Sequence, residues 1–271
     1  MHRIASRPDP APPQHRHALR AVAMPTEHGG WGLTAEPIVL GLAVAPSIAG
    51  LFLGLAAMLA FVARTPLRIV LVDHHRNRDL DRTALARRVL TVELAALAAF
   101  VAAAMLTATA TFWWPAAIAA PLVGVELWFD TRSRSRRLLP ELAGTFGICS
   151  IAAMILLAAG HAPHVAVAAW LILAARGTTA IPHVRAQIAR LHDRPASARL
   201  LLAADVAALA IAGSSAIVAP AVIGGTVSVA GVVLFQRMTT RTPVPAKVIG
   251  IRQTLLGLAV VVATAIGLRL V

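Results

Sequence analysis

The sequence predicts an all-α membrane protein with about nine transmembrane helices, a cytoplasmic N-terminus and a C-terminus outside. Hydrophobic residues make up 58% of the chain and charged residues 14%, against roughly 25% charged residues in ordinary soluble domains. Several apolar stretches extend for about 20 residues, the length that a helix needs to cross a bilayer. With nine helices, 24 of the 25 lysines and arginines fall on one side. That side is cytoplasmic, because basic loops are retained there.

The composition excludes two broad classes of protein. A mean hydropathy of +0.75 excludes a soluble globular core. A net charge of +13 could indicate nucleic-acid binding, but the charges flank apolar stretches, where anionic lipid headgroups are the nearer partner. The single cysteine, Cys149, lies in an apolar stretch, so the chain has neither a disulfide framework nor a cysteine-based metal site.

Residues 1–24 are expected to form a disordered basic cytoplasmic tail. This segment has four prolines between positions 8 and 13 and lacks the apolar core of a secretory signal. Residues 25–271 are expected to form one polytopic helical domain.

The first four helices are predicted from apolar runs and the breaks between them. Residues 33–44 form a short run that ends at a proline-containing break. The longer run at 48–72 ends at a charged loop, and the run at 89–107 begins where that loop ends. Residues 113–129 follow a short uncharged connection and end at a run of arginines.

The other five helices follow the same alternation of short uncharged turns and longer basic loops. They are predicted at residues 140–159, 164–175 with a continuation toward 189, 198–216, 218–235 and 251–270. Because the external turns are short and almost uncharged, any site open to soluble chemistry is expected on the inner face.

Five carboxylates are predicted within the hydrocarbon layer, where each costs several kcal/mol unless it has a partner or faces a polar cavity. They are Glu36, Glu93, Glu126, Glu141 and Asp205. Glu141 is expected to interact with the dipole at the start of its helix. Glu36 precedes a proline, and broken spans often line cavities. The other three either pair with arginines or hydroxyls, or line a proton or ion pathway.

The segment MPTEHGGWGLTAEP at residues 24–37 departs most from what membrane insertion requires. Glu27 and His28 place a carboxylate beside an imidazole, the two glycines that follow permit a tight turn, and Trp31 is typical of a membrane interface. A Glu-His-Gly-Gly sequence is not needed for anchoring, which favours a functional role for this segment.

These residues carry a resemblance. The Pro-x-Glu-His-Gly-x-Trp pattern at 25–31, followed by Pro37, resembles the amino-terminal signature of the YwiC-like family of bacterial membrane proteins, which is largely uncharacterised. The Arg-Thr-Pro-Leu run at 64–67 and the Ala-Arg and Val-Arg steps at 175–176 and 184–185 are also similar to that family. The resemblance extends over most of the chain beyond residue 24.

The number of helices and the two long cytoplasmic loops also resemble the UbiA superfamily of membrane prenyltransferases. In that superfamily, Asp-rich loops hold Mg²⁺ on an isoprenoid diphosphate, and basic residues after the fourth helix contact the diphosphate. Here Asp73, Asn77 and Asp81 at i, i+4 and i+8 would share a helical face. The loop after the sixth helix has one acid, Asp193, where the family has two, so the second metal motif is missing.

The resemblance implies a site at the inner face. Acid–base work is assigned to Glu27, His28 and Glu36. Ligand binding is assigned to the metal-loop and basic residues, namely Arg64, Arg68, Asp73, Asn77, Asp81, Arg136, Arg137, Arg176 and Arg185. For the run that contains Arg136 and Arg137, a charge run that fixes topology is the better explanation.

Three classes of function follow. The first is an inner-membrane protein whose cytoplasm-facing polar cavity binds an anionic lipid or isoprenoid diphosphate, as a divergent prenyltransferase-like enzyme. Its partners would be membrane lipids and an isoprenoid diphosphate, with no nucleic acid; its cofactor is left open, and Mg²⁺ is one candidate. The second is an ion- or proton-coupled transporter that uses the intramembrane carboxylates, and the third is a non-catalytic membrane assembly factor.

Overall fold

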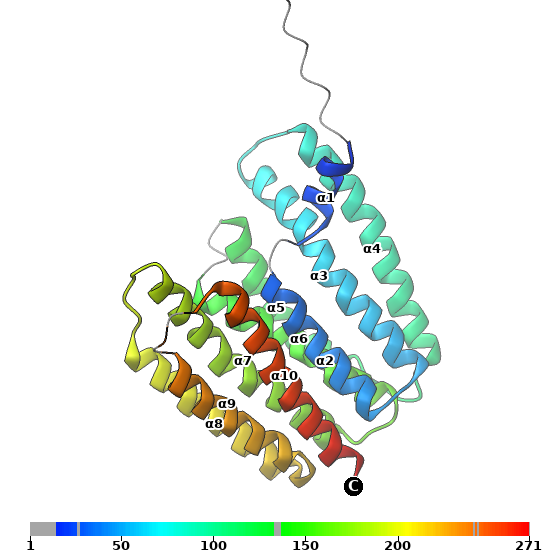
Figure 1. The fold of residues 1–271 in the computed structure, drawn as a ribbon. Coiled ribbons are helices and arrows are strands. Elements are labelled where there is room, and N and C mark those ends of the chain that lie inside the picture. The colour runs from blue at the N-terminus through cyan, green and yellow to red at the C-terminus, as the bar shows by residue number, and fades with distance from the viewer. Residues whose placement is uncertain (1–14, 26–27, 133–136, 241, 243, 271) are drawn as a thin grey trace, which may run out of the picture.

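The computed structural model describes residues 15–25, 28–132, 137–240, 242 and 244–270, and all regular structure in this part of the chain is helical (Figure 1). The elements are α1 (His15–Ala23), α2 (His28–Val44), α3 (Ile48–His75), α4 (Asp81–Thr107), α5 (Trp114–Thr131), α6 (Leu138–Ala158), α7 (Pro163–Leu191), α8 (Ala198–Val218), the short 3₁₀ helix η1 (Pro220–Val222), α9 (Ile223–Thr239) and α10 (Ala246–Arg269).

Each of the nine apolar segments predicted from the sequence forms a helix, α2 to α10. Seven helical segments are long and apolar enough to cross a membrane: α3, α4, α6, α7, α8, α10 and Pro220–Thr239. Helix α2 falls short because it has only 17 residues. Helix α5 has 18 residues but includes Glu126 and Asp130, which lower its hydropathy.

The helices differ from the prediction at some of their ends. Helix α4 already begins at Asp81, and α7 continues through Pro182 to Leu191 as one helix. Residues 15–23, which the sequence assigns to a disordered tail, form α1 on α3 and α4. The buried side chain of Val22 gives this short helix an apolar contact. The rest of the expected tail, residues 1–14, lies outside the described residues.

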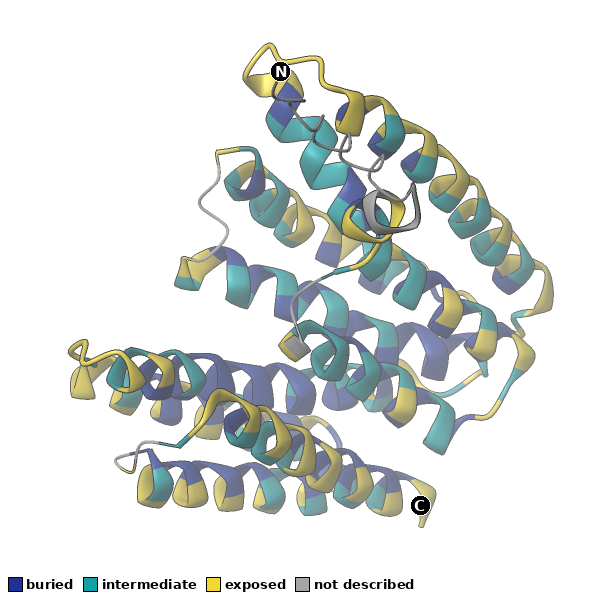
Figure 2. Cartoon of the chain, turned by 45° about the horizontal axis from the view of Figure 1, so that its top comes forward, coloured by how far each residue is buried: buried dark blue, intermediate teal, exposed yellow. Residues whose placement is uncertain are grey.

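The helices run up and down, with α6 and α7 in the middle and α3 and α4 forming a hairpin along one side (Figure 1). Buried residues concentrate in the central helices, and exposed residues cover the outer ones (Figure 2). Small residues allow close packing: a Cβ added to Gly41 or Gly50 would lie 2.8 Å from the side chain of Ile155. Close approach at small residues is typical of helices that pack within a membrane.

The C-terminal ends of α3, α5, α7 and α9 lie at one end of the bundle, and the C-terminus lies at the opposite end (Figure 1). We call the first of these the charged end, because the basic connections that follow these four helices are located there. The turns at the opposite end are short and nearly uncharged.

Candidate functional site

Polar side chains from five helices form a hydrogen-bonded network inside the bundle. We call it the interior network; among the described residues it consists of Glu36, Arg176, Thr179, His183, Asp205, Gln236, Arg237, Thr240 and Gln253. Its members come from α2, α7, α8, α9 with the residue that follows it, and α10.

The inner part of the network is built around Arg176, the fourteenth of the 29 residues of α7. Its Nη2 lies 3.2 Å from Oε1 of Glu36, and the two side chains are 3% and 11% exposed. The same Nη2 donates a hydrogen bond of 2.6 Å to the backbone carbonyl of Gln253. Its Nε is buried without a hydrogen-bond partner among the described residues. Gly257 keeps space for this pair, since a Cβ there would overlap the carboxylate of Glu36.

The outer part of the network is centred on Asp205. Its Oδ1 accepts a 2.7 Å hydrogen bond from Thr179 and lies 3.0 Å from Nε2 of His183. Its Oδ2 accepts a 2.8 Å hydrogen bond from Nε of Arg237. Asp205 and His183 are buried, whereas the side chain of Arg237 is 47% exposed. Among these partners of Asp205 in the described part of the chain, Arg237 is therefore the one with substantial exposure outside the bundle.

Amides and hydroxyls join the two parts and extend the network to the charged end. The Thr179 hydroxyl lies 2.9 Å from Oε1 of Gln236, and the Gln236 amide lies 3.4 Å from that of Gln253. Nδ1 of His183 lies 2.7 Å from the Thr240 hydroxyl. Arg190 donates a 2.6 Å hydrogen bond to the Thr240 carbonyl. Along α7 the distance from Arg176 to Arg190 is about 21 Å at the usual helical rise.

The bundle is apolar on the other side of this network. Ile155 of α6, Ile172 of α7 and Val260 of α10 are completely buried and belong to one hydrophobic core. They lie beyond Arg176 toward the uncharged end of the bundle. The hydrogen-bonded groups therefore extend from Arg176 toward the charged end, and the buried side chains on the other side are mostly apolar.

A second group of charges joins α3 to α5. Arg64 makes an ion pair of 2.7 Å with Glu126, and its Nε donates a 3.1 Å hydrogen bond to Asp130, which is fully buried. Gly144 of α6 lies against Glu126, where a Cβ would overlap the carboxylate. Glu126 and Asp205 therefore both pair with arginines, which is one of the two alternatives left open by the sequence. Glu93 differs, since its buried Oε2 has no hydrogen-bond partner among the described residues.

The predicted metal loop after α3 does not form a helical face. Helix α3 ends at His75, and Asn77 lies in a turn with a φ of 49°. Asp81 begins the next helix and is exposed. The expectation that Asp73, Asn77 and Asp81 share one face is wrong, because the turn interrupts the helix between them.

Asp73 has a structural position in the same hairpin. Its Oδ2 accepts a 2.6 Å hydrogen bond from the Thr83 hydroxyl, and its Oδ1 accepts a 3.0 Å hydrogen bond from Arg82. Both partners belong to the first turn of α4. The described residues contain no group of three or more His, Cys, Asp or Glu side chains that could hold a metal ion. The residues present do not fit the expected Mg²⁺ site.

The other predicted site residues that the structure describes are distributed over several helices. Arg185 pairs with Glu141 at 2.8 Å, and Glu141 lies in the first turn of α6, as predicted. Arg68 is partly exposed on α3, and Arg137 is exposed at the start of α6. Glu27 and Arg136 lie outside the described residues, and of His28 the structure describes only the backbone, at the start of α2.

Of the predicted site residues, the structure joins Glu36 and Arg176 in the interior network. Sequence reasoning missed His183, Thr179 and the two glutamines as members of this site. One signal was present in the sequence: Arg176, Thr179 and His183 follow one another at spacings of three and four, which places them on one face of α7.

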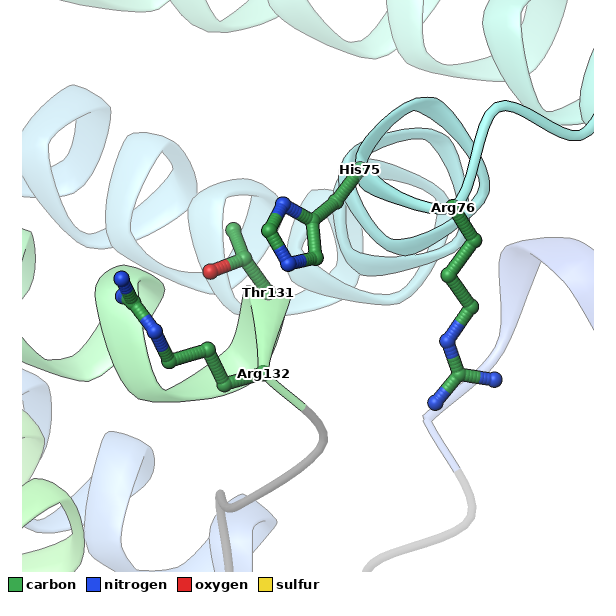
Figure 3. Close-up of a pocket in the computed structure, with 4 residues that line it drawn as sticks. All are labelled: His75, Arg76, Thr131 and Arg132. Carbon is green, nitrogen blue, oxygen red and sulfur yellow. The ribbon is translucent and has the colours of Figure 1, made fainter.

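An open hollow of about 430 Å³ lies at the charged end, between the ends of α3 and α5. Its lining consists of His75, Arg76, Thr131 and Arg132 (Figure 3). The Arg132 guanidinium lies 3.7 Å from the centre of the Trp128 ring, which is a cation–π contact. Three of the four lining side chains are basic, so the hollow suits an anion.

An all-helical bundle with seven candidate spans and ion pairs enclosed between them defines a multi-pass membrane protein. Within this class, residues 24–156 match the model of the family described as YwiC-like protein. The match includes Glu36 and Arg64 and ends within α6, so the resemblance expected for the later helices lies beyond it. No curated protein and no solved structure matches the chain, and neither comparison supports a relationship to the UbiA superfamily.

Proposed function

We propose that this protein is a proton- or ion-coupled membrane transporter whose coupling site is the interior network. One observation carries this proposal: hydrogen-bonded polar groups extend from the middle of α7 to the charged end, and a hydrophobic core lies on the opposite side. Polar groups that reach only one end of a bundle are the arrangement expected of a carrier whose site is accessible from one side of the membrane at a time.

The energetics favour a functional role for these groups. An ion pair taken out of water is often no more stable than an apolar pair of similar size. The pair Glu36–Arg176 and the cluster around Asp205 therefore need a reason other than stability. Ionisable groups that face a bundle interior commonly mark substrate paths or proton relays. Glu36, His183 and Asp205 are the members of the network whose side chains are carboxylates or an imidazole, the types that commonly exchange protons.

The membrane orientation expected from the sequence can be applied to the helical bundle. We place the charged end on the cytoplasmic side of a bacterial inner membrane, since basic connections are retained there. With nine helices crossing, the N-terminus is then cytoplasmic and Arg269 lies near the outer surface. In this orientation the end of the interior network at Thr240 and Arg190 faces the cytoplasm.

Binding of an anionic lipid or isoprenoid diphosphate is the second candidate. The structure gives little support to Arg64, Arg176 and Arg185 as its ligands, because each forms an ion pair with a carboxylate of another helix. The hollow lined by His75, Arg76 and Arg132 is the observation in its favour. A UbiA-like bundle that performs prenyl transfer is the narrower form of this candidate, and a lipid-holding assembly factor is its non-catalytic form.

Cysteine accessibility tests the transporter proposal. In a Cys149→Ala background, single cysteines replace Ile172 and Val260 in the apolar half, and Leu258, which is exposed on the outside of the bundle near the middle of α10 and would face lipid, serves as the control. A transporter must open this half to the far side during its cycle. We expect an impermeant thiol reagent applied from that side to label the first two positions in a pH-dependent manner and to spare the control. Both positions remaining unlabelled at every pH would overturn the proposal.

A further inference from the structure

We infer that His183 and Asp205 together hold one exchangeable proton, which makes this pair the proton-binding site of the interior network. The role of that proton in transport rests on the proposed function, but the site itself does not. The two side chains come from α7 and α8, are nearly completely buried, and lie 3.0 Å apart.

Counting hydrogens supports the shared proton. Four contacts can each be filled by one hydrogen: Thr179 to Asp205, Asp205 to His183, His183 to Thr240, and Thr240 to the backbone carbonyl of Gln236. With a neutral imidazole and an ionised carboxylate, these groups supply three hydrogens, one from each threonine hydroxyl and one from the ring. The Thr240 hydroxyl then donates either to the ring or to the carbonyl, which already accepts the Thr240 backbone N–H. One further proton on the ring fills the fourth contact.

Reorienting the glutamine amides does not supply the fourth hydrogen. The Thr179 hydroxyl also lies 2.9 Å from Oε1 of Gln236. Turning that amide lets its nitrogen donate to Thr179, because the oxygen and nitrogen of an amide are assigned from the network. The hydroxyl hydrogen of Thr179 then serves Asp205 alone, and the other three contacts still share two hydrogens, one from the neutral ring and one from Thr240. The added proton belongs to the pair rather than to either residue.

The charges around the pair make this proton exchangeable. The groups that face it are Arg237 of α9, which donates to Asp205, and Arg190 of α7, which donates to the Thr240 carbonyl. Helix α10 contributes the neutral Gln253 to the network. The carboxylate balances one of the two arginines, so the added proton lies beside one uncompensated positive charge. Hydrogen bonding therefore favours uptake of the proton, and electrostatic repulsion favours its release.

Arg237 also defines a route for the exchange. Asp205 is buried, but its partner Arg237 is about half exposed and sits in the last turn of α9, near the charged end. Displacement of this one side chain uncovers Oδ2 of the carboxylate. We place the exchange of the proton at this point.

Nitrogen NMR of histidine-labelled, full-length protein in lipid nanodiscs tests the inference, with His183→Gln used to assign the resonance. Asp205→Asn should lower the proton affinity of His183 at least tenfold, which is about one pH unit. Arg237→Gln should raise the affinity, because it removes a neighbouring positive charge. Asp193→Asn, in the exposed turn after α7, should leave it unchanged.

Two results would overturn the inference. One is a His183 titration that is identical in wild type and Asp205→Asn, and the other is a His183 ring that stays neutral between about pH 5 and pH 9. Arg237→Gln protects the test against a misfolded Asp205→Asn, since its effect has the opposite sign and its side chain is half exposed. The NMR result does not depend on transport. If the His183 titration depends on Asp205 but neither Ile172→Cys nor Val260→Cys is labelled, the proton site stands and the transporter proposal fails. If the cysteines are labelled but the titration does not depend on Asp205, the transporter proposal stands and the proton site fails.

Discussion

The carboxylate of Glu36 lies 3.2 Å from the guanidinium of Arg176, and this ion pair joins the short helix α2 to the middle of α7. Helix α2 is too short to be counted among the candidate spans. Apolar residues such as Leu40 pack this helix into the core, and the ion pair connects the segment that matches the YwiC-like family to the helices beyond it.

Removing one partner of this pair should destabilise the protein strongly. Arg176→Met leaves the Glu36 carboxylate buried without its partner, which typically costs about 3–5 kcal/mol. The double variant Glu36→Met, Arg176→Met removes both charges and should recover much of that loss. Unfolding free energies in a denaturant series in lipid-detergent micelles check this. A double variant no more stable than Arg176→Met would contradict the pairing.

Adding one methyl group beside the pair should also be harmful. In Gly257→Ala the new Cβ would overlap the Glu36 carboxylate, and overpacking of this kind costs about 1–3 kcal/mol. Gly250→Ala on the same helix is the matched control, because a Cβ there has no atom within 4 Å. Thermal unfolding should separate the two variants. Equal midpoints would show that α10 does not press against Glu36.

Asp73 should behave as a structural residue of the α3–α4 hairpin. Asp73→Ala leaves the buried Thr83 hydroxyl without its acceptor, which costs about 1–3 kcal/mol. Asp81→Ala, exposed at the start of α4, should change stability by less than about 0.5 kcal/mol. Because Arg82 and Thr83 already occupy the Asp73 oxygens, Mg²⁺ should not raise the melting temperature of the wild type. A Mg²⁺-dependent stabilisation lost in Asp73→Ala would restore the metal-site hypothesis.

The basic hollow should retain phosphate-bearing lipids. Replacing His75, Arg76 and Arg132 by Gln should reduce several-fold the anionic lipid that co-purifies, as counted by native mass spectrometry. Arg194→Gln with Arg199→Gln removes exposed charge elsewhere at the same end and serves as the control. Competition by free inorganic phosphate would identify the headgroup as the recognised part. An unchanged lipid count in the triple variant would exclude the hollow as the binding site.

The sequence predicted the helices well because a bilayer imposes a length on every apolar run, and all nine runs became helices. It predicted less of the site, because partners in different helices leave no local pattern. Glu36 and Arg176 were both predicted as site residues, but Glu36 for acid–base work and Arg176 for ligand binding, and not as partners of each other. Asp73, Asn77 and Asp81 were grouped on the assumption of a continuous helix, and the turn at Asn77 ends it. His183, Gln236 and Gln253 become part of a site only when α7, α9 and α10 pack together.

Charge movement after a pH jump tests the central claim most directly. Proteoliposomes on a solid-supported membrane receive a sudden acidification from the charged side, and the transient current reports protons that enter the interior network. We predict a current for the wild type that falls at least tenfold in Asp205→Asn and persists in the exposed control Asp193→Asn. A current of wild-type size in Asp205→Asn, with the variant folded, would contradict the account.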